Sequence, residues 1–166
     1  MARMTRSPAR LMTPTLQAQA ALEIETPGEG FTDITREARA FLAEVGAKDG
    51  LLHIFCQHTS ASLTIQENAD PDVQTDLLTA LRRLAPETHP WVHDLEGPDD
   101  MPAHVRTLLT DTSLAIPVRD SALALGAWQG LYLVEHRRKP HRRTVILTFA
   151  GQSVLDSPAC NLRHRD

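Results

Sequence analysis

The alternation of apolar and polar positions divides the chain into strands and helices. Every second residue over 16–24 is apolar, which is typical of a strand with one buried face. An apolar stripe at helical spacing runs from Val73 to Leu84, with Asp70 placed to cap the helix and Pro71 at its first position. Along the whole chain, these patterns predict strands over about 13–25, 51–65, 113–118, 123–135 and 143–150, and helices over about 35–46, 71–84 and 102–109.

The order of these elements indicates an α+β fold. Strands and helices do not alternate as parallel βαβ units require, and short polar turns between the later strands favour antiparallel pairing. We expect one compact domain over 13–152, with a mixed, mostly antiparallel sheet packed against about three helices. Residues 1–12 are predicted to form a disordered extension and residues 153–166 a flexible tail. The segment 51–65 is long enough for two strands or one bent strand, and Asp49-Gly50 before it predicts a turn.

Charge and composition exclude several classes of protein. The 166 residues include 17 basic and 21 acidic side chains, a formal charge of −4, which argues against a nucleic-acid partner. No apolar run approaches the roughly 20 residues that span a bilayer, and no apolar segment follows the arginines of the N-terminus. We therefore expect a cytoplasmic protein without membrane contact. Cys56 and Cys160 are expected to be free thiols, because two such cysteines make no disulfide framework.

Polar residues suited to binding or catalysis follow the apolar part of the segment 51–65. His58, Ser60 and Ser62 are predicted to share one strand face, where they could donate hydrogen bonds to a phosphate or orient water. An ordinary solvent-facing strand is the alternative. Glu67 precedes the helix cap and is expected close to His58, where it would suit general acid/base chemistry or metal ligation. A surface charge at a turn is the alternative for Glu67.

A second group of candidate residues lies in the loop before the third helix. His93 and His104 bracket four acidic residues in this loop and the start of the helix. Imidazole with carboxylate is the ligand set of zinc, manganese or non-haem iron, whereas carboxylates alone suit magnesium. The spacing matches no compact metal motif, and Asp99 and Asp100 are explained equally well as helix caps.

The last candidates lie around the strand predicted over 123–135. Trp128 and Gln129 stand between two glycines, which suggests a bulge or a close backbone approach. Trp128 could stack on a heteroaromatic ring, although filling the core or a subunit contact is the more frequent role of tryptophan. Arg143 begins the next strand and could either clamp a phosphate or pair with Glu135 across the turn.

Three stretches of the sequence together resemble the YjbQ family. They are HTSASLTIQENADP from His58, HDLEGPDDMPAH from His93 and LGAWQG from Leu125, followed by Arg142-Arg143. The resemblance runs in order from about Thr15 to Gly151, and the first stretch is quite specific. It departs from the family at Ala127, where relatives often have threonine.

The resemblance implies a compact α+β fold assembled as a homotrimer, with polar pockets near subunit contacts. It also implies a secondary thiamine-phosphate synthase activity, which joins a hydroxymethylpyrimidine diphosphate to a thiazole phosphate with loss of diphosphate. His93 and His104 would hold a divalent metal (Zn, Mn, Fe or Mg), and His58 and Glu67 would act as general acid and base, with Glu67 also a candidate third ligand. The residues expected to bind the small phosphorylated heterocyclic substrate are Ser60, Ser62, Trp128, Gln129 and Arg143.

The residues leave two functions open. The first is an enzyme with weak or secondary activity, because the sequence has no dense basic cluster and no paired-carboxylate motif of the kind that a diphosphate–magnesium complex requires. The second is a trimeric metal- or small-ligand-binding protein without significant catalysis. A kcat/KM near or above about 10⁴ M⁻¹s⁻¹ would favour the enzyme.

Overall fold

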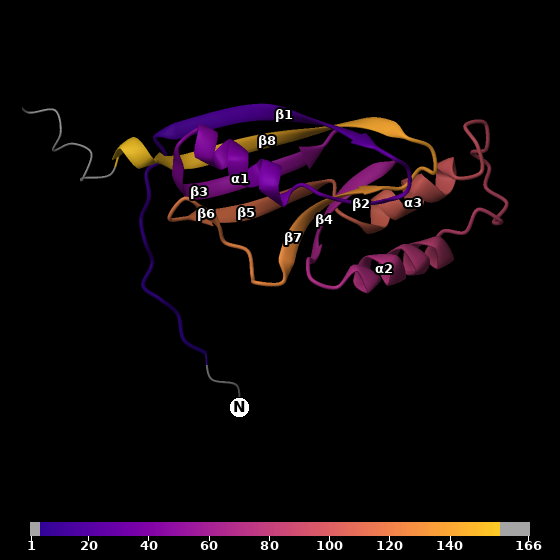
Figure 1. The fold of residues 1–166 in the computed structure, drawn as a ribbon, viewed down its shortest axis with the longest axis horizontal. Coiled ribbons are helices and arrows are strands. Elements are labelled where there is room, and N and C mark those ends of the chain that lie inside the picture. The colour runs from indigo at the N-terminus through magenta and orange to yellow at the C-terminus, as the bar shows by residue number, and fades with distance from the viewer. Residues whose placement is uncertain (1–3, 157–166) are drawn as a thin grey trace, which may run out of the picture.

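Two antiparallel sheets form the frame of the protein in a computed structural model that describes residues 4–156 (Figure 1). Every strand pair in the described part of the chain is antiparallel. The five-stranded sheet contains, in spatial order, β1 (Leu16–Thr26), β8 (His141–Ser153), β3 (Ala47–Cys56), β5 (Ser113–Arg119) and β6 (Ala122–Leu123). The three-stranded sheet contains β2 (Gly30–Asp33), β7 (Gln129–Glu135) and β4 (Ala61–Glu67).

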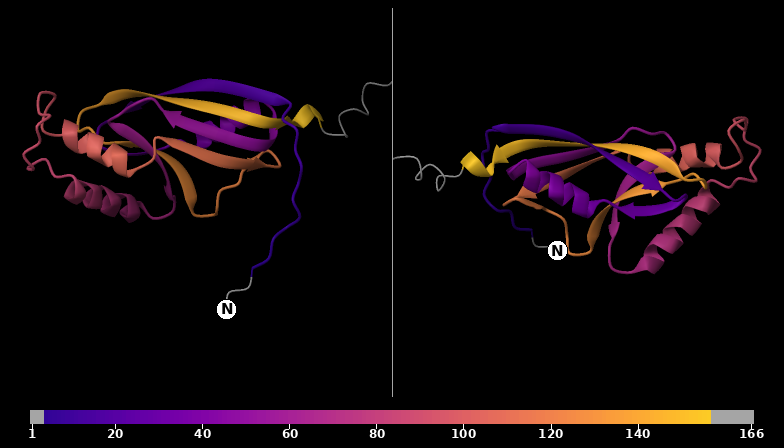
Figure 2. Two further views of the ribbon diagram at one scale, coloured as in Figure 1. Left: turned by 180° about the vertical axis from the view of Figure 1, so that it is seen from behind. Right: turned by 45° about the horizontal axis from the view of Figure 1, so that its top comes forward.

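Three α-helices accompany the sheets, which confirms the predicted α+β fold. α1 (Thr35–Glu44) lies across one face of the five-stranded sheet (Figure 2) and contacts β3, β6, β7 and β8. α2 (Pro71–Leu84) and α3 (Asp100–Leu109) contact each other beside the three-stranded sheet, toward one end of the elongated molecule. A short 3₁₀ turn, Val154–Asp156, follows β8.

The hydrophobic core lies where α1 and the two sheets meet. Alternate residues of the long strands point into it, as the period of two predicts, and their neighbours face outward. α1 adds Phe41 and Leu42 from its buried side and ends before Gly46, whose φ of +65° is the left-handed conformation that favours glycine after a helix. Fully buried members of the core include Leu52, Ile54, Leu63, Leu131, Leu133 and Phe149.

The segment 51–65 forms two strands that belong to different sheets. β3 ends at Cys56, and β4 begins at Ala61 after a short turn. The prediction of one continuous polar face through His58 and Ser62 is therefore wrong, because the turn breaks the alternation between them. The chain crosses here from the larger sheet to the smaller one, and this crossing places His58 and Ser60 at the junction of the sheets.

Two predicted boundaries differ from the structure for tertiary reasons. The turn expected at Asp49-Gly50 lies inside β3, at a register irregularity where Gly50 faces Gly151 of β8. A Cβ on either glycine would collide with the opposing backbone, so the close approach of strands requires glycine here. The strand predicted over 123–135 is interrupted, because β6 pairs with β5 in one sheet and β7 with β2 and β4 in the other.

The described part of the chain, residues 4–156, extends beyond each end of the predicted domain. Residues 4–15 form no helix or strand, while β8 and the 3₁₀ turn continue to residue 156. Residues 1–3 of the predicted extension and 157–166 of the predicted tail, including Cys160, lie outside the described residues. Over residues 4–156, no helix has the length and apolar character needed to cross a membrane.

Candidate functional site

Two histidines and an aspartate converge at the start of α3. Asp100 and His104 are one helical turn apart and therefore lie on the same side of α3, and His93 approaches them from the preceding loop. The His93 Nε2 lies 2.7 Å and the His104 Nε2 3.4 Å from the same oxygen, Asp100 Oδ2. One ligand atom from each residue lies within 4.8 Å of the other two. The spacing therefore suits a single cation.

Neighbouring groups hold these side chains in place. The His104 Nδ1 lies 2.9 Å from the carbonyl oxygen of Thr59. Because a carbonyl only accepts hydrogen bonds, Nδ1 carries the proton, and the lone pair of Nε2 is directed at the group. Asp100 is buried, and its second oxygen, Oδ1, accepts a hydrogen bond from the guanidinium of Arg137. This leaves Oδ2 to face the two imidazoles.

Asp99, the residue before α3, organises the adjacent turn. No side-chain capping bond forms at Asp99; its carboxylate instead accepts bonds from Arg137 Nε at 3.1 Å and from the backbone N–H of Arg138 at 2.9 Å. Burial alone would raise the pKa of Asp99, but these bonds and the charge of Arg137 outweigh it and hold the pKa below its usual value. The helix start and the turn between β7 and β8 are thereby locked together.

The donor set fits a divalent transition metal. Two imidazoles and one carboxylate are the protein ligands of several catalytic zinc and iron sites, which keep a position open for water or substrate. Ligand bonds of about 2.0–2.1 Å place neighbouring ligand atoms roughly 3.3 Å apart in a tetrahedral site. The 3.4 Å separation is close to this value, whereas the 2.7 Å separation is a hydrogen-bond contact that would have to lengthen for a metal to enter.

A second constellation lies next to this group, at the turn between β3 and β4. Arg143 of β8 is buried and pairs with Glu135 through Nε at 2.7 Å and NH2 at 2.6 Å. The same guanidinium lies 3.2 Å from Ser60 Oγ and 3.5 Å from His58 Nδ1. Of the two roles considered for Arg143, the ion pair is thus formed, and the remaining N–H groups face the turn. Ser62 is fully buried and bonds His136 Nε2 at 2.8 Å, away from the surface.

His58 is held as a neutral imidazole. The backbone N–H of Thr144 donates to its Nε2 at 2.7 Å. Burial, and then the positive charge of Arg143, lower the pKa of His58 below its usual value. Because Nε2 accepts this bond, the proton of the neutral ring is on Nδ1, and His58 can take up or release a proton only after the bond from Thr144 breaks.

An open cavity connects the two constellations. Its volume is about 360 Å³, and both His58 and His104 line it together with Thr59. Thr107, Leu108, Thr110 and Thr112 complete the wall, and its exposed surface is more apolar than polar. The cavity is large enough for a small heterocycle, and its lining offers hydrogen-bond donors and acceptors.

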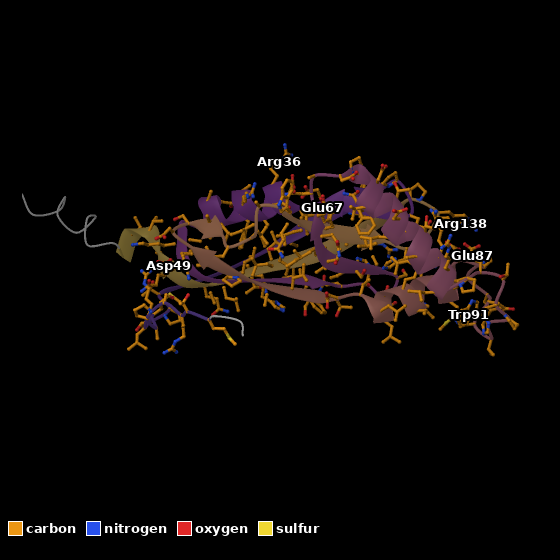
Figure 3. All side chains as sticks on the ribbon, turned by 90° about the horizontal axis from the view of Figure 1, so that it is seen from below. Arg36, Asp49, Glu67, Glu87, Trp91 and Arg138 are labelled. Atoms are coloured by element: carbon orange, nitrogen blue, oxygen red, sulfur yellow. The ribbon has the colours of Figure 1, made fainter. Side chains whose placement is uncertain are left out.

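Glu67, Trp128 and Gln129 gather elsewhere. β4 separates His58 from Glu67, a distance of about 20 Å along six or more extended residues, so the expectation that they are neighbours does not hold within one chain. Glu67 pairs with Gln129 across the sheet, and Trp128 beside it is 68% exposed. Figure 3 shows Glu67 away from the end of the molecule where Glu87, Trp91 and Arg138 lie.

Sequence reasoning missed Asp100 as the central carboxylate of the histidine group. Capping accounts for both Asp99 and Asp100 at the level of sequence, yet neither makes a side-chain capping bond that the structure describes. The signal for Asp100 is its spacing of four residues from His104 on a helix, which brings two ligand types to one face. The role of Arg137 in binding both aspartates has no local signal, because this contact joins segments 37 residues apart.

Comparisons with solved structures support the same fold. A hypothetical protein of Aeropyrum pernix K1 matches with a TM-score of 0.75 and 30% identity, over 81% of this chain and 99% of its own. A conserved hypothetical protein of Thermus thermophilus matches with a TM-score of 0.68 and 41% identity, over 76% of this chain and 97% of its own.

The sequence comparisons agree. A UPF0047 protein of Synechocystis is 47% identical over 82% of this chain and 93% of its own length, and the UPF0047 protein YjbQ of Escherichia coli O157:H7 is 40% identical over 81% and 98%. These names assign no reaction. The family model described as "UPF0047 protein YjbQ-like" matches residues 20–152, which contain both constellations. The chain therefore belongs to the YjbQ/UPF0047 family.

Proposed function

We propose that His93, Asp100 and His104 bind a divalent metal ion in a site that has weak or secondary thiamine-phosphate synthase activity. The observation that carries this proposal is the convergence of the three ligand atoms, with the His104 Nε2 lone pair directed at Asp100 Oδ2 by the bond from Nδ1 to Thr59. The reaction class comes from the family resemblance, and the cavity beside the group, which is large enough for a small heterocycle, supports it.

The proposed reaction transfers a pyrimidine methylene carbon from diphosphate to a thiazole nitrogen. The nitrogen lone pair forms the new C–N bond while the C–O bond to diphosphate breaks, and the bonding electrons leave with the diphosphate. A bound divalent cation would supply positive charge to the departing oxygens. The protein must therefore hold two phosphorylated molecules in line and keep water out of the reacting pair.

The turn between β3 and β4 supplies substrate contacts in this proposal. Ser60 Oγ accepts a hydrogen bond from Arg143, which leaves its own hydroxyl proton free to bind a phosphate oxygen. Arg143 does not line the cavity itself, and its guanidinium is paired with Glu135. His58 would exchange a proton only after the bond from Thr144 to its Nε2 breaks. Ser62 would not contact the substrate; its hydrogen bond positions His136 in the core.

In a homotrimer, Glu67, Trp128 and Gln129 of one copy could contribute to the site of another. Trp128 is exposed enough to stack on a heterocycle, and Glu67 and Gln129 lie beside it, at the far end of β4 from the cavity. We propose that a neighbouring copy supplies these residues to the site. Apolar side chains that a single chain leaves uncovered support assembly: Leu51 and Phe55 on the outer face of β3 are 44% and 42% exposed.

Metal content tests the first part of the proposal. Protein purified without chelator should hold about one transition metal per chain. His93→Ala and His104→Ala should each lose it, whereas His89→Ala, which removes an exposed histidine of the same loop as His93, should retain it. A wild-type protein that stays metal-free after supplementation, or equal loss in all three variants, contradicts the assignment.

Kinetics tests the reaction. The wild type and the same three variants are assayed for thiamine phosphate formation from the two phosphorylated precursors, each with saturating metal. Activity that disappears in His93→Ala and His104→Ala but persists in His89→Ala supports the proposal. Metal binding without a substrate-dependent rate would overturn the catalytic part.

The second candidate function, metal or ligand binding without significant catalysis, has its own supporting observation. The two guanidinium groups that contact the site are already engaged, Arg137 with both aspartates and Arg143 with Glu135. Little positive charge is left for a diphosphate leaving group. A kcat/KM orders of magnitude below about 10⁴ M⁻¹s⁻¹ would favour this function.

A further inference from the structure

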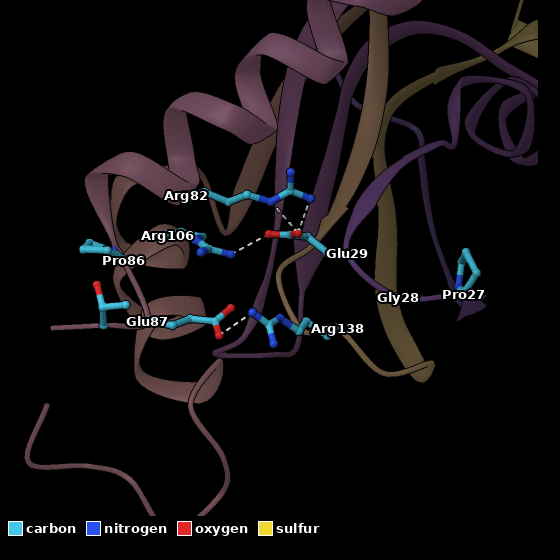
Figure 4. Close-up of a pocket in the computed structure, with 9 residues that line it drawn as sticks. Pro27, Gly28, Glu29, Arg82, Pro86, Glu87, Arg106 and Arg138 are labelled. Carbon is cyan, nitrogen blue, oxygen red and sulfur yellow. Dashed lines mark hydrogen bonds and ion pairs between the residues drawn. The ribbon is translucent and has the colours of Figure 1, made fainter. Parts of the chain in front are cut away.

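An arginine-rich depression lies on the molecule apart from the histidine group. It has a volume of about 820 Å³ and opens between the turn joining β1 to β2, the end of α2, and α3 (Figure 4). Five charged side chains from five separate segments line it: Glu29, Arg82, Glu87, Arg106 and Arg138. The sequence does not predict that these arginines meet, because they lie far apart along the chain.

The charges in this depression do not balance. Glu29 serves two arginines at once: its Oε2 accepts from Arg82 Nε at 2.8 Å, and its Oε1 accepts from Arg106 NH1 at 2.6 Å. Arg138 pairs with Glu87, with 2.5 Å between NH2 and Oε2. Three guanidinium groups thus face two carboxylates, which leaves one positive charge in a concave site.

Arg106 carries the second, independent observation. Its side chain is only 3% exposed, and its Nε has no hydrogen-bond partner among the described residues. The NH2 group donates to the carbonyl of Ala85 at 3.1 Å. Burial lowers the pKa of Arg106, and Glu29 opposes this effect. An unpartnered buried donor on a charged group is costly, so the contacts with Glu29 and Ala85 leave Arg106 incompletely satisfied.

We propose that this depression binds the phosphate group of a small molecule, as inorganic phosphate or a phosphate monoester. A phosphate dianion would offset the excess charge, and planar guanidinium groups match the spacing of phosphate oxygens. The side chains of Arg82 and Arg138 are 54% and 64% exposed, so both can turn from their glutamates toward a ligand. Arg106 forms the fixed base of the site.

The proposed phosphate site is separate from the metal group but linked to it through the backbone. None of His93, Asp100 and His104 lines the depression. Arg137 bonds Asp100, whereas the next residue, Arg138, lines the depression and pairs with Glu87. The proposal does not depend on catalysis or on bound metal, and it is tested without either.

A purely structural role for these ion pairs is the competing explanation. The pairs join the β1–β2 turn to α2 and α3, and exposed pairs of this kind contribute little to stability, about 0–1 kcal/mol each. If they were only structural, neutralising an arginine would change stability but create no loss of phosphate affinity. The two explanations therefore differ in a measurable quantity.

The experiment titrates inorganic phosphate into the full-length, metal-free protein by calorimetry at low ionic strength. Arg82→Gln and Arg138→Gln should each raise the Kd at least about tenfold, because each removes a charge-assisted contact. Arg142→Gln is the matched control: Arg142 is 70% exposed and pairs with Glu23 at 3.0 Å, on β1 and β8 away from the depression. Its Kd should equal that of the wild type. Glu87→Gln should lower the Kd severalfold, because it removes a repelling charge.

Several outcomes would overturn the proposal. They are no heat of binding at tens of millimolar phosphate, an equal effect of Arg142→Gln, or a Glu87→Gln variant that binds more weakly. Phosphate binding that is lost in His104→Ala but kept in Arg82→Gln and Arg138→Gln would assign the anion to the histidine site instead. Urea unfolding midpoints confirm that each variant is folded, and if Arg82→Gln fails to fold, Arg138→Gln and Glu87→Gln still decide the question.

Discussion

The buried histidine next to the Glu135–Arg143 pair makes stability depend on pH. His136 is 1% exposed, bonds Ser62 through Nε2, and has no partner for Nδ1 among the described residues. Burial, followed by the nearby charge of Arg106, lowers the pKa of His136 from 6.5 to about 4. The folded protein therefore binds fewer protons at this residue than the unfolded chain between these two pH values.

The size of the effect follows from the pKa difference. Because the pKa is depressed in the folded state, the stabilisation is fully present above pH 6.5 and is lost as pH falls toward 4. A difference of about 2.5 pKa units is equivalent to about 3 kcal/mol in total. Applying the same linkage, about 2 kcal/mol is lost between pH 7 and pH 5.

Urea unfolding at pH 7, 6 and 5 measures this loss. His136→Gln cannot titrate, so its free energy of unfolding should fall about 2 kcal/mol less than that of the wild type over this range. His53→Gln, on the exposed face of β3, should retain the wild-type dependence. Groups such as Glu135, whose pKa lies below its usual value, are present in all three proteins and cancel from the comparison.

Two results would refute this reasoning. One is the same pH dependence in His136→Gln and the wild type. The other is an NMR titration of the wild type in which the His136 ring becomes protonated near pH 6.5. The NMR measurement needs no variant, so it remains decisive even if His136→Gln is too unstable to study.

Three further predictions concern stability, each checked by urea unfolding. Gly151→Ala should destabilise the protein by about 1–3 kcal/mol, because the added Cβ would collide with the Asp49 carbonyl; an unchanged midpoint would mean that β3 and β8 can move apart. Leu133→Ala should cost about 2–5 kcal/mol, because Leu133 is fully buried in β7, and a loss below about 1 kcal/mol would contradict its place in the core. Asp70→Ala should cost about 1 kcal/mol by removing the 2.9 Å bond from the Asp72 N–H, whereas Asp70→Asn should restore most of it.

Local patterns are enough to predict most of the helices and strands. The alternation over 16–24 predicts β1, and the stripe with Asp70 and Pro71 predicts α2 to within a residue. Both signals are local, because the period of burial and the satisfaction of a helix end depend on residues a few positions apart. The predictions at Asp49-Gly50 and over 123–135 are wrong because pairing with distant strands, which the local pattern does not show, determines the structure there.

The candidate site shows the same division. Residue type alone identifies His93 and His104, and the structure brings them together. Local pattern assigns Asp100 to capping, because only the fold of the loop turns its carboxylate toward both imidazoles. Glu67 is expected beside His58 from sequence, because it follows the polar end of the predicted strand, whereas in the structure the length of β4 separates the two residues.

The sequence by itself determined the α+β class and the residue types available for chemistry, since these depend on local pattern and composition, and its three motif stretches indicated the family. Tertiary structure alone decided which of those residues meet. Arg137 reaches Asp100, Glu29 reaches Arg106 and Ser60 reaches Arg143 from positions tens of residues away along the chain. Such contacts depend on how two sheets and three helices pack, and packing is determined by the burial of the whole core rather than by any single segment.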